Sequence, residues 1–132
     1  MNLLLIIAAL IEALAGLALL LIPTVAVSTL LGATLNTVTG LAVSRIAGAA
    51  LIALAIACWK SKNEPGNSAI GVVEAMSFYN FAAAMVLVHA GIRLDLRSAL
   101  IWPVIVLHLG LGAWCVFTIW STRRRVSRSE MT

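Results

Sequence analysis

The sequence predicts an all-α integral membrane protein in which four transmembrane helices form a single bundle. Of its 132 residues, 62% are hydrophobic and 11% are charged, whereas soluble domains carry about 25% charged residues. Four apolar runs recur along the chain, and each is close to the roughly 20 residues that span the hydrocarbon core of a bilayer. These spans use most of the length, so we expect one membrane domain over residues 1–132.

The first apolar run, residues 3–22, is rich in Leu, Ile and Ala and ends at Pro23, which cannot continue a helix. It is longer than the apolar segment of a signal peptide and has no basic residues before it, so we expect a retained helix. Residues 24–40 are uncharged but too interrupted by Ser, Thr and Gly to span, which predicts a short helix at the membrane surface. A re-entrant loop is the alternative, although irregular backbone exposed to lipid is disfavoured at depth. Three further helices are expected over residues 41–59, 69–91 and 99–120, with a basic tail over 121–132.

The distribution of basic residues predicts the orientation of the bundle. One side has more of them than the other, and cytoplasmic loops are the ones enriched in Lys and Arg. We therefore expect both termini in the cytoplasm, with lipid or a partner protein as a second role for the tail. The richer side carries Lys60, Lys62, Arg123, Arg124, Arg125 and Arg128, and the poorer side carries Arg93 and Arg97, with Arg45 if it snorkels.

A single acid, Glu12, lies at the centre of the first apolar run. A charge there costs at least about 2.5–3.5 kcal/mol, so the carboxyl group must be paired, hydrogen-bonded or protonated. Arg45, about one turn inside the second helix, either snorkels to the interface or pairs with Glu12. Glu12 therefore has three possible roles: a hydrogen-bonded acid, half of an ion pair, or a site that couples a proton to binding.

Polar residues of three predicted helices fall in one layer of the membrane. Glu12, Asn80 and His108 each lie within about two residues of a helix centre, hence within roughly 3 Å in depth, and Tyr79 is at the same level. Such a cluster can hold a shared proton, bind a cation or the polar head of an apolar molecule, or relay a proton between Glu74 and Arg45. The alternative is a hydrogen-bonded plug that only fixes helix register.

Gly40, Ser44 and Gly48 repeat at four-residue spacing, a pattern typical of close helix packing in membranes. Because a bundle of this size is small, we expect this face to support a homo-oligomer or a contact with a membrane-complex partner. The third helix ends near His89, which we interpret as an interfacial histidine and not as a metal ligand.

The motifs that mark most enzyme classes are missing from the sequence. Cys58 and Cys115 form no CxxC pair, which argues against thiol–disulfide chemistry and favours a packing role. His89 and His108 lie roughly 10 Å or more apart in depth, which argues against a metal or bis-histidyl haem site. No nucleophile–base pair, Gly-rich phosphate loop or paired-carboxylate motif occurs. We therefore expect no cofactor and no metal, do not expect an enzyme, and expect no nucleic-acid partner, because the net charge of +4 comes mainly from the tail.

Several short features together resemble the DoxX-like small four-helix membrane proteins of bacteria, many of which have no assigned function. They are Pro23 closing the first helix, the stretch Leu30-Leu31-Gly32, the segment Ser44-Arg45-Ile46-Ala47-Gly48, Asn80, and the basic tail. The resemblance implies a four-helix bundle in the bacterial inner membrane and carries over no established chemistry.

The first helix is also similar to that of small multidrug resistance transporters, which carry one membrane-embedded Glu in helix one. The likeness is limited to Glu12 and Gly16, and no further motif matches.

The leading functional hypothesis is a membrane protein that binds or translocates a lipophilic or cationic small molecule, or a proton, at the layer of Glu12, Asn80 and His108. A non-catalytic accessory subunit of a larger membrane complex is the first alternative. A quinone-linked redox enzyme is the second, although the sequence shows no cofactor motif. An accessory subunit would need a second face of small residues directed outward.

Overall fold

The computed structural model describes residues 1–64, 67–93 and 98–129, and within these ranges it contains helices and no strand. Four of the helices are long and apolar enough to cross a membrane, so the chain is a multi-pass membrane protein and the predicted all-α bundle is confirmed. The helices of the described residues are α1 (Asn2–Leu21), α2 (Pro23–Leu31), α3 (Val38–Ser61), α4 (Asn67–Arg93) and α5 (Ile101–Ser129).

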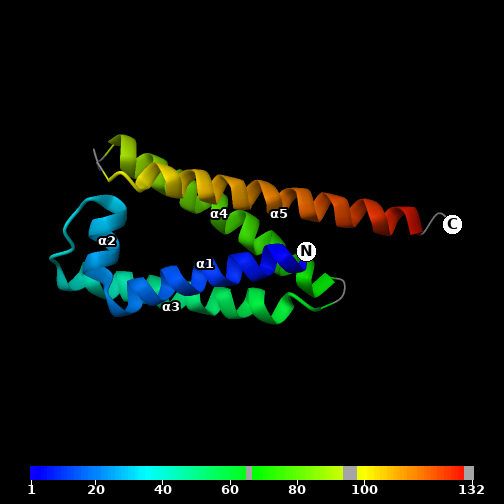
Figure 1. Ribbon diagram of the computed structural model, residues 1–132, viewed down its shortest axis with the longest axis horizontal. Coiled ribbons are helices and arrows are strands. Elements are labelled where there is room, and N and C mark those ends of the chain that lie inside the picture. Colours follow the sequence, from blue (N-terminus) through cyan, green and yellow to red (C-terminus); the bar gives the residue numbers. More distant parts are fainter. Residues whose placement is uncertain (65–66, 94–97, 130–132) are drawn as a thin grey trace.

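The four long helices form two antiparallel hairpins, α1 with α3 and α4 with α5 (Figure 1). Helices pack most extensively within each hairpin, and the contacts between hairpins are fewer. The N-terminus and the C-terminal end of α5 lie at the same end of the bundle, as the ribbon shows (Figure 1). An even number of spans therefore puts both ends of the chain on one side of the membrane.

The α1–α3 hairpin is held by two facing glycines. A Cβ atom added at Gly48 would lie 2.7 Å from the carbonyl oxygen of Gly16, and one added at Gly16 would lie 2.8 Å from that of Gly48. No side chain fits at such distances, so both positions require glycine for the backbones to approach this closely. Gly48 therefore packs inside one chain, and Gly40 packs against the preceding loop at Leu35 and Thr37. Two of the three residues that were expected to form an oligomer contact, Gly40 and Gly48, therefore pack within the chain.

The apolar core joins the two hairpins near the end that carries the chain termini. Cys58 and Cys115 are both free thiols and both fully buried there, which confirms their packing role. Core residues come from α1, α3, α4 and α5, and they are Leu4, Leu5, Ala8, Ala9, Cys58, Val73, Met76, Leu111 and Cys115.

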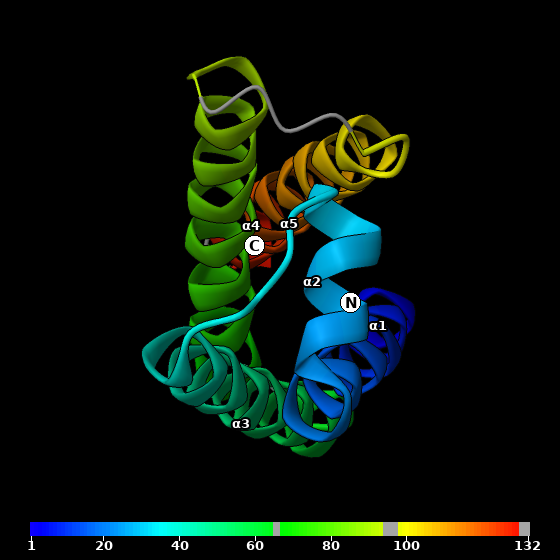
Figure 2. The ribbon, with the colours of Figure 1, turned by 90° about the vertical axis from the view of Figure 1, so that its left-hand side faces the viewer.

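The short helix expected after Pro23 is present as α2, which begins at Pro23, ends at Leu31 and is followed by Gly32 with φ of 68°. Seen end-on, α2 stands between α1 and the start of α5 (Figure 2). The Ser98 hydroxyl donates to the carbonyl oxygen of Thr29 at 2.6 Å and accepts from the Leu100 N–H. Because α5 begins at Ile101, Ser98 connects the segment that precedes α5 to α2.

Two helix boundaries differ by three residues or more from the sequence-based expectation. The second long helix begins at Val38 instead of residue 41, because the Thr37 hydroxyl accepts a hydrogen bond of 3.0 Å from the Gly40 N–H and caps it. The last helix continues to Ser129, so most of the predicted tail over 121–132 is helical. The guanidinium of Arg124 lies 3.6 Å from the centre of the Trp120 ring, a cation–π contact that supports this extension.

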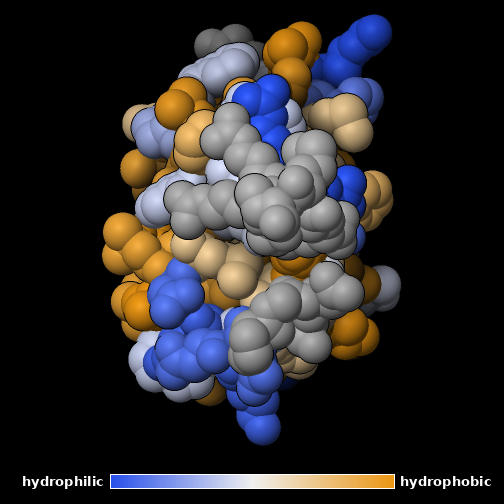
Figure 3. Space-filling model, turned by 90° about the vertical axis from the view of Figure 1, so that its right-hand side faces the viewer, coloured by the Kyte–Doolittle hydropathy of each residue, from blue (hydrophilic) through white to orange (hydrophobic). Residues whose placement is uncertain are grey.

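Aromatic and basic side chains mark the ends of the spans. Trp59, Trp102 and Trp120 are about half exposed near helix ends, as expected for an interfacial belt. The ammonium of Lys62 lies 3.0 Å from the centre of the Trp59 ring. Viewed from the end with the termini, hydrophilic residues gather on the end face and hydrophobic ones lie along its flanks (Figure 3).

Candidate functional site

Glu12 lies in the interior of the bundle. The small residues Ala8, Ala9 and Gly16 share its face of α1 and are themselves buried. The carboxyl group is 1% exposed. The Tyr79 hydroxyl on α4 lies close to it. The Oε1 atom of this carboxyl group is buried and has no hydrogen-bond partner among the described residues.

Asn80 and His108 form a second polar contact, between α4 and α5. The Asn80 amide nitrogen donates to the Met76 carbonyl oxygen at 2.8 Å, which leaves the amide oxygen free to accept. That oxygen is 2.9 Å from Nδ1 of His108. An amide oxygen only accepts, so Nδ1 carries the hydrogen, and Nε2 is the acceptor of the neutral ring.

Tyr79 connects the two polar contacts. Its ring lies edge-on to the His108 ring, with the centroids 5.8 Å apart and an angle of 79° between the planes. Edge-to-face packing at this distance is a favourable aromatic arrangement. The structure thus brings together Glu12, Tyr79, Asn80 and His108, which come from three helices and from both hairpins. We call these four residues the polar cluster.

Arg45 does not lie near the polar cluster. Gly16 on α1 packs against Ile52 and Gly48 on α3. Because the two helices are antiparallel, Glu12 and Arg45 are displaced in opposite directions from this contact, by roughly 15 Å along the bundle in total. Arg45 is exposed. Its position corresponds to the snorkelling alternative. The polar neighbour of Glu12 is therefore Tyr79 and not Arg45.

Glu74 has a different partner from the one considered in the sequence. Its carboxylate accepts a hydrogen bond of 2.7 Å from the Arg123 guanidinium, and both side chains are about half exposed. Arg123 was assigned only to the basic tail, so this ion pair was missed. The signal was available: both residues lie toward the same predicted side of the membrane, on helices expected to be neighbours in sequence.

The remaining ionisable groups do not add a metal site to the polar cluster. Within residues 1–64, 67–93 and 98–129, no three His, Cys, Asp or Glu side chains are grouped so that they could hold an ion. His89 is exposed near the end of α4. It lies far along that helix from Asn80, the residue that contacts His108. The chemistry that the polar cluster offers is therefore that of a carboxyl group, a phenol and an imidazole: proton exchange and binding of a hydrogen-bond donor or cation.

Comparisons of the chain with protein-family models, with curated proteins and with solved structures give no match.

Proposed function

We propose that this membrane protein binds and translocates a proton at Glu12, alone or together with a lipophilic or cationic small molecule. The observation that carries the proposal is Oε1 of Glu12, a buried acceptor with no partner in the described residues. An unpaired polar atom in the membrane interior is expensive, so it is retained where function uses it. A proton or a cationic group bound at Oε1 would satisfy it.

The surroundings of Glu12 favour a small ligand that arrives when the hairpins separate. The carboxyl group is 1% exposed, and the groove described below includes none of the polar cluster. Because Tyr79 of one hairpin lies close to Glu12 of the other, a ligand at Oε1 acts at a contact between the two hairpins. Binding at Glu12 would thereby bias hairpin packing, as in alternating access.

The second ionisable group of the polar cluster is His108, on the opposite hairpin from Glu12. Its Nε2 is the ring atom left to accept a proton once Nδ1–H has donated to Asn80. A proton released from Glu12 while the hairpins are apart could be taken up there. Glu12 is thus the primary proton site and His108 the second, with Tyr79 between them.

The test uses the purified chain in liposomes loaded with a pH-sensitive dye, under an imposed pH gradient, with tetraphenylphosphonium uptake measured in parallel. Glu12→Gln keeps the size of the side chain and an acceptor for Tyr79 but cannot exchange a proton. Glu64→Gln, which removes an exposed carboxylate outside the spans, is the matched control. We expect Glu12→Gln to fold and to lose proton-linked flux, and Glu64→Gln to retain it.

Thermal stability in detergent, measured on the same proteins and on Glu12→Ala, separates the three roles of Glu12. If the acid were half of an ion pair, Glu12→Gln would destabilise the fold by roughly 3–5 kcal/mol. If it served as a hydrogen-bonded acid alone, Glu12→Gln would leave stability and flux unchanged. Equal flux in wild type, Glu12→Gln and Glu64→Gln would overturn the proposed function.

The proposal includes the membrane in which the protein is located and the side on which its termini lie. The excess of Lys and Arg at the end that carries the termini supports cytoplasmic termini. The resemblance to DoxX-like proteins supports the bacterial inner membrane. Membrane lipids are then its immediate partners.

An accessory subunit or homo-oligomer is the second function that a specific observation favours. Ala49 and Ala53 are exposed on α3 and lie four residues apart, which gives the hairpin a second face of small residues directed outward. If this face carries a subunit contact, Ala53→Leu should lower the native mass in mild detergent, whereas Ile56→Leu on the same exposed surface should not. Unchanged mass in Ala53→Leu would exclude this face as the contact.

A further inference from the structure

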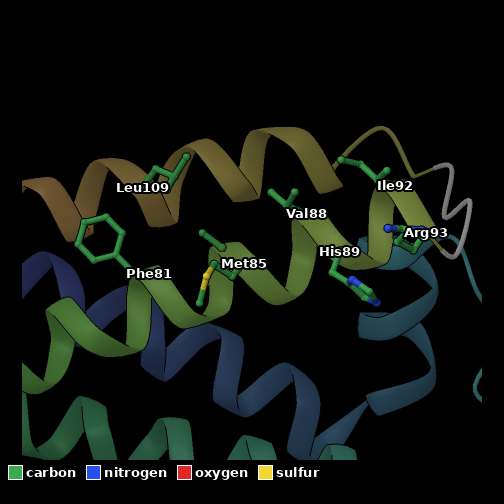
Figure 4. A pocket seen from close by; sticks show the side chains of 8 residues that line it. Phe81, Met85, Val88, His89, Ile92, Arg93 and Leu109 are labelled. Carbon is green, nitrogen blue, oxygen red and sulfur yellow. The ribbon is translucent and has the colours of Figure 1, made fainter.

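A groove of about 520 Å³ runs along the exposed side of α4, away from the polar cluster. Its walls are apolar for most of its length and carry cationic or ionisable side chains at one end (Figure 4). The lining residues are Phe81, Ala84, Met85, Val88, His89, Ile92, Arg93 and Leu109.

The length and depth of the groove match one leaflet of a bilayer. From Phe81 to Arg93 the helix rises by about 18 Å, at 1.5 Å per residue. Phe81 lies near the middle of the described span, Ala69–Arg93. The apolar part of the groove therefore extends from the membrane midplane through about half of the roughly 30 Å hydrocarbon core, and Arg93 reaches the headgroup region.

The groove is closed at its inner end by the Phe81 ring, which packs where α5 carries Gly112. A Cβ atom added at Gly112 would lie 3.0–3.2 Å from ring atoms of Phe81, so the ring packs directly on the α5 backbone. Leu109, one turn earlier in α5, closes the same end. An extended apolar chain entering from the headgroup side would end against this ring.

The charge at the outer end selects the headgroup. Arg93 and His89 lie four residues apart, hence on one face of α4. A guanidinium binds phosphate oxygens through paired N–H groups, and an imidazole one turn deeper can donate to a phosphate or ester oxygen. The walls below them, Val88 and Met85, offer only apolar contacts.

We propose that this groove binds one anionic phospholipid, with its phosphate at Arg93 and His89 and one acyl chain running along α4 to Phe81. The site is independent of Glu12 and of the proposed proton chemistry. The site differs from an ordinary lipid contact of the protein surface, because basic side chains and an apolar groove of one leaflet's depth lie next to each other.

Native mass spectrometry of the delipidated chain tests the site, with phosphatidylglycerol or phosphatidylcholine of identical acyl chains added back. A basic residue near the membrane surface changes the affinity for an anionic lipid about fivefold. We therefore expect one tightly held phosphatidylglycerol in the wild type and an affinity about fivefold lower in Arg93→Gln. Arg45→Gln is the matched control, because Arg45 is an exposed cation at the same end of the bundle and does not line this groove.

A second pair of variants tests the groove itself. Val88→Trp fills it, and Val86→Trp adds the same ring to an exposed position of α4 that does not line it. We expect only Val88→Trp to lose the tightly held lipid. Equal loss in Arg93→Gln and Arg45→Gln, equal binding of the two lipids, or equal behaviour of the two Trp variants would overturn the proposal. So would a dimer that disappears only in Val88→Trp, because the groove would then be a protein contact.

Discussion

Replacing Gly48 by alanine should loosen the α1–α3 hairpin. The new Cβ would lie 2.7 Å from both the Gly16 carbonyl oxygen and the Leu20 backbone nitrogen. Both neighbours are backbone atoms, so no side chain can rotate out of the way. Restoring the 3.4 Å at which ordinary contact begins requires a displacement of about 0.7 Å between the two helices.

The expected cost follows from this displacement. Overpacking that forces backbone shifts costs typically about 1–3 kcal/mol, while exchanging Gly for Ala inside a helix contributes about 1 kcal/mol in the opposite direction. Gly110→Ala and Gly71→Ala isolate the second effect, because a Cβ atom at either position meets nothing within 4 Å. We expect Gly48→Ala to be about 1–3 kcal/mol less stable than Gly110→Ala.

Equilibrium unfolding in mixed micelles with increasing sodium dodecyl sulfate, followed by circular dichroism, measures these differences. Gly16→Ala should cost a similar amount. The double variant should cost less than the two single ones combined, because the first substitution has already separated the helices. If Gly48→Ala proved as stable as Gly110→Ala, the close approach of α1 and α3 would be refuted.

Three further predictions concern other contacts. A double-mutant cycle of Asn80→Leu and His108→Phe should give a coupling of about 0.6–1.7 kcal/mol in the same unfolding assay, and a coupling near zero would contradict their hydrogen bond. Arg123→Gln should cost less than about 1 kcal/mol and lose its effect at high salt, because its ion pair with Glu74 is half exposed. Reporter fusions after Thr132 should show a cytoplasmic C-terminus, and a periplasmic one would contradict the orientation.

The spans themselves could be predicted because each is an apolar run of about 20 residues, and such runs have one stable form in lipid. The ends of the helices were harder to predict from the sequence. Thr37 starts α3 earlier than hydropathy indicates, because capping depends on one hydroxyl in a polar stretch. The extension of α5 was missed because Arg residues were interpreted as a topology signal, although Arg also favours helices.

The shared depth of Glu12, Asn80 and His108 followed from the sequence, since depth is a simple count along each helix. Which side chains touch did not follow, because pairing depends on which helices are neighbours and how each is rotated. Tyr79 was placed at the right level, but its approach to Glu12 required the two hairpins to be placed against each other. The groove at Arg93 gave no sequence signal, because its walls are ordinary apolar residues.

The Gly16–Gly48 contact also has a consequence for biogenesis. Every residue that it requires has been synthesised once Ser61 is complete, so the first hairpin can close at that stage. The 32 residues from there through Arg93 take about 2–6 s at ordinary translation rates. During this interval Glu12 is already in the membrane and Tyr79 is not. A nascent chain that stalls between the hairpins would therefore leave the Glu12 carboxyl group in the lipid without Tyr79 beside it.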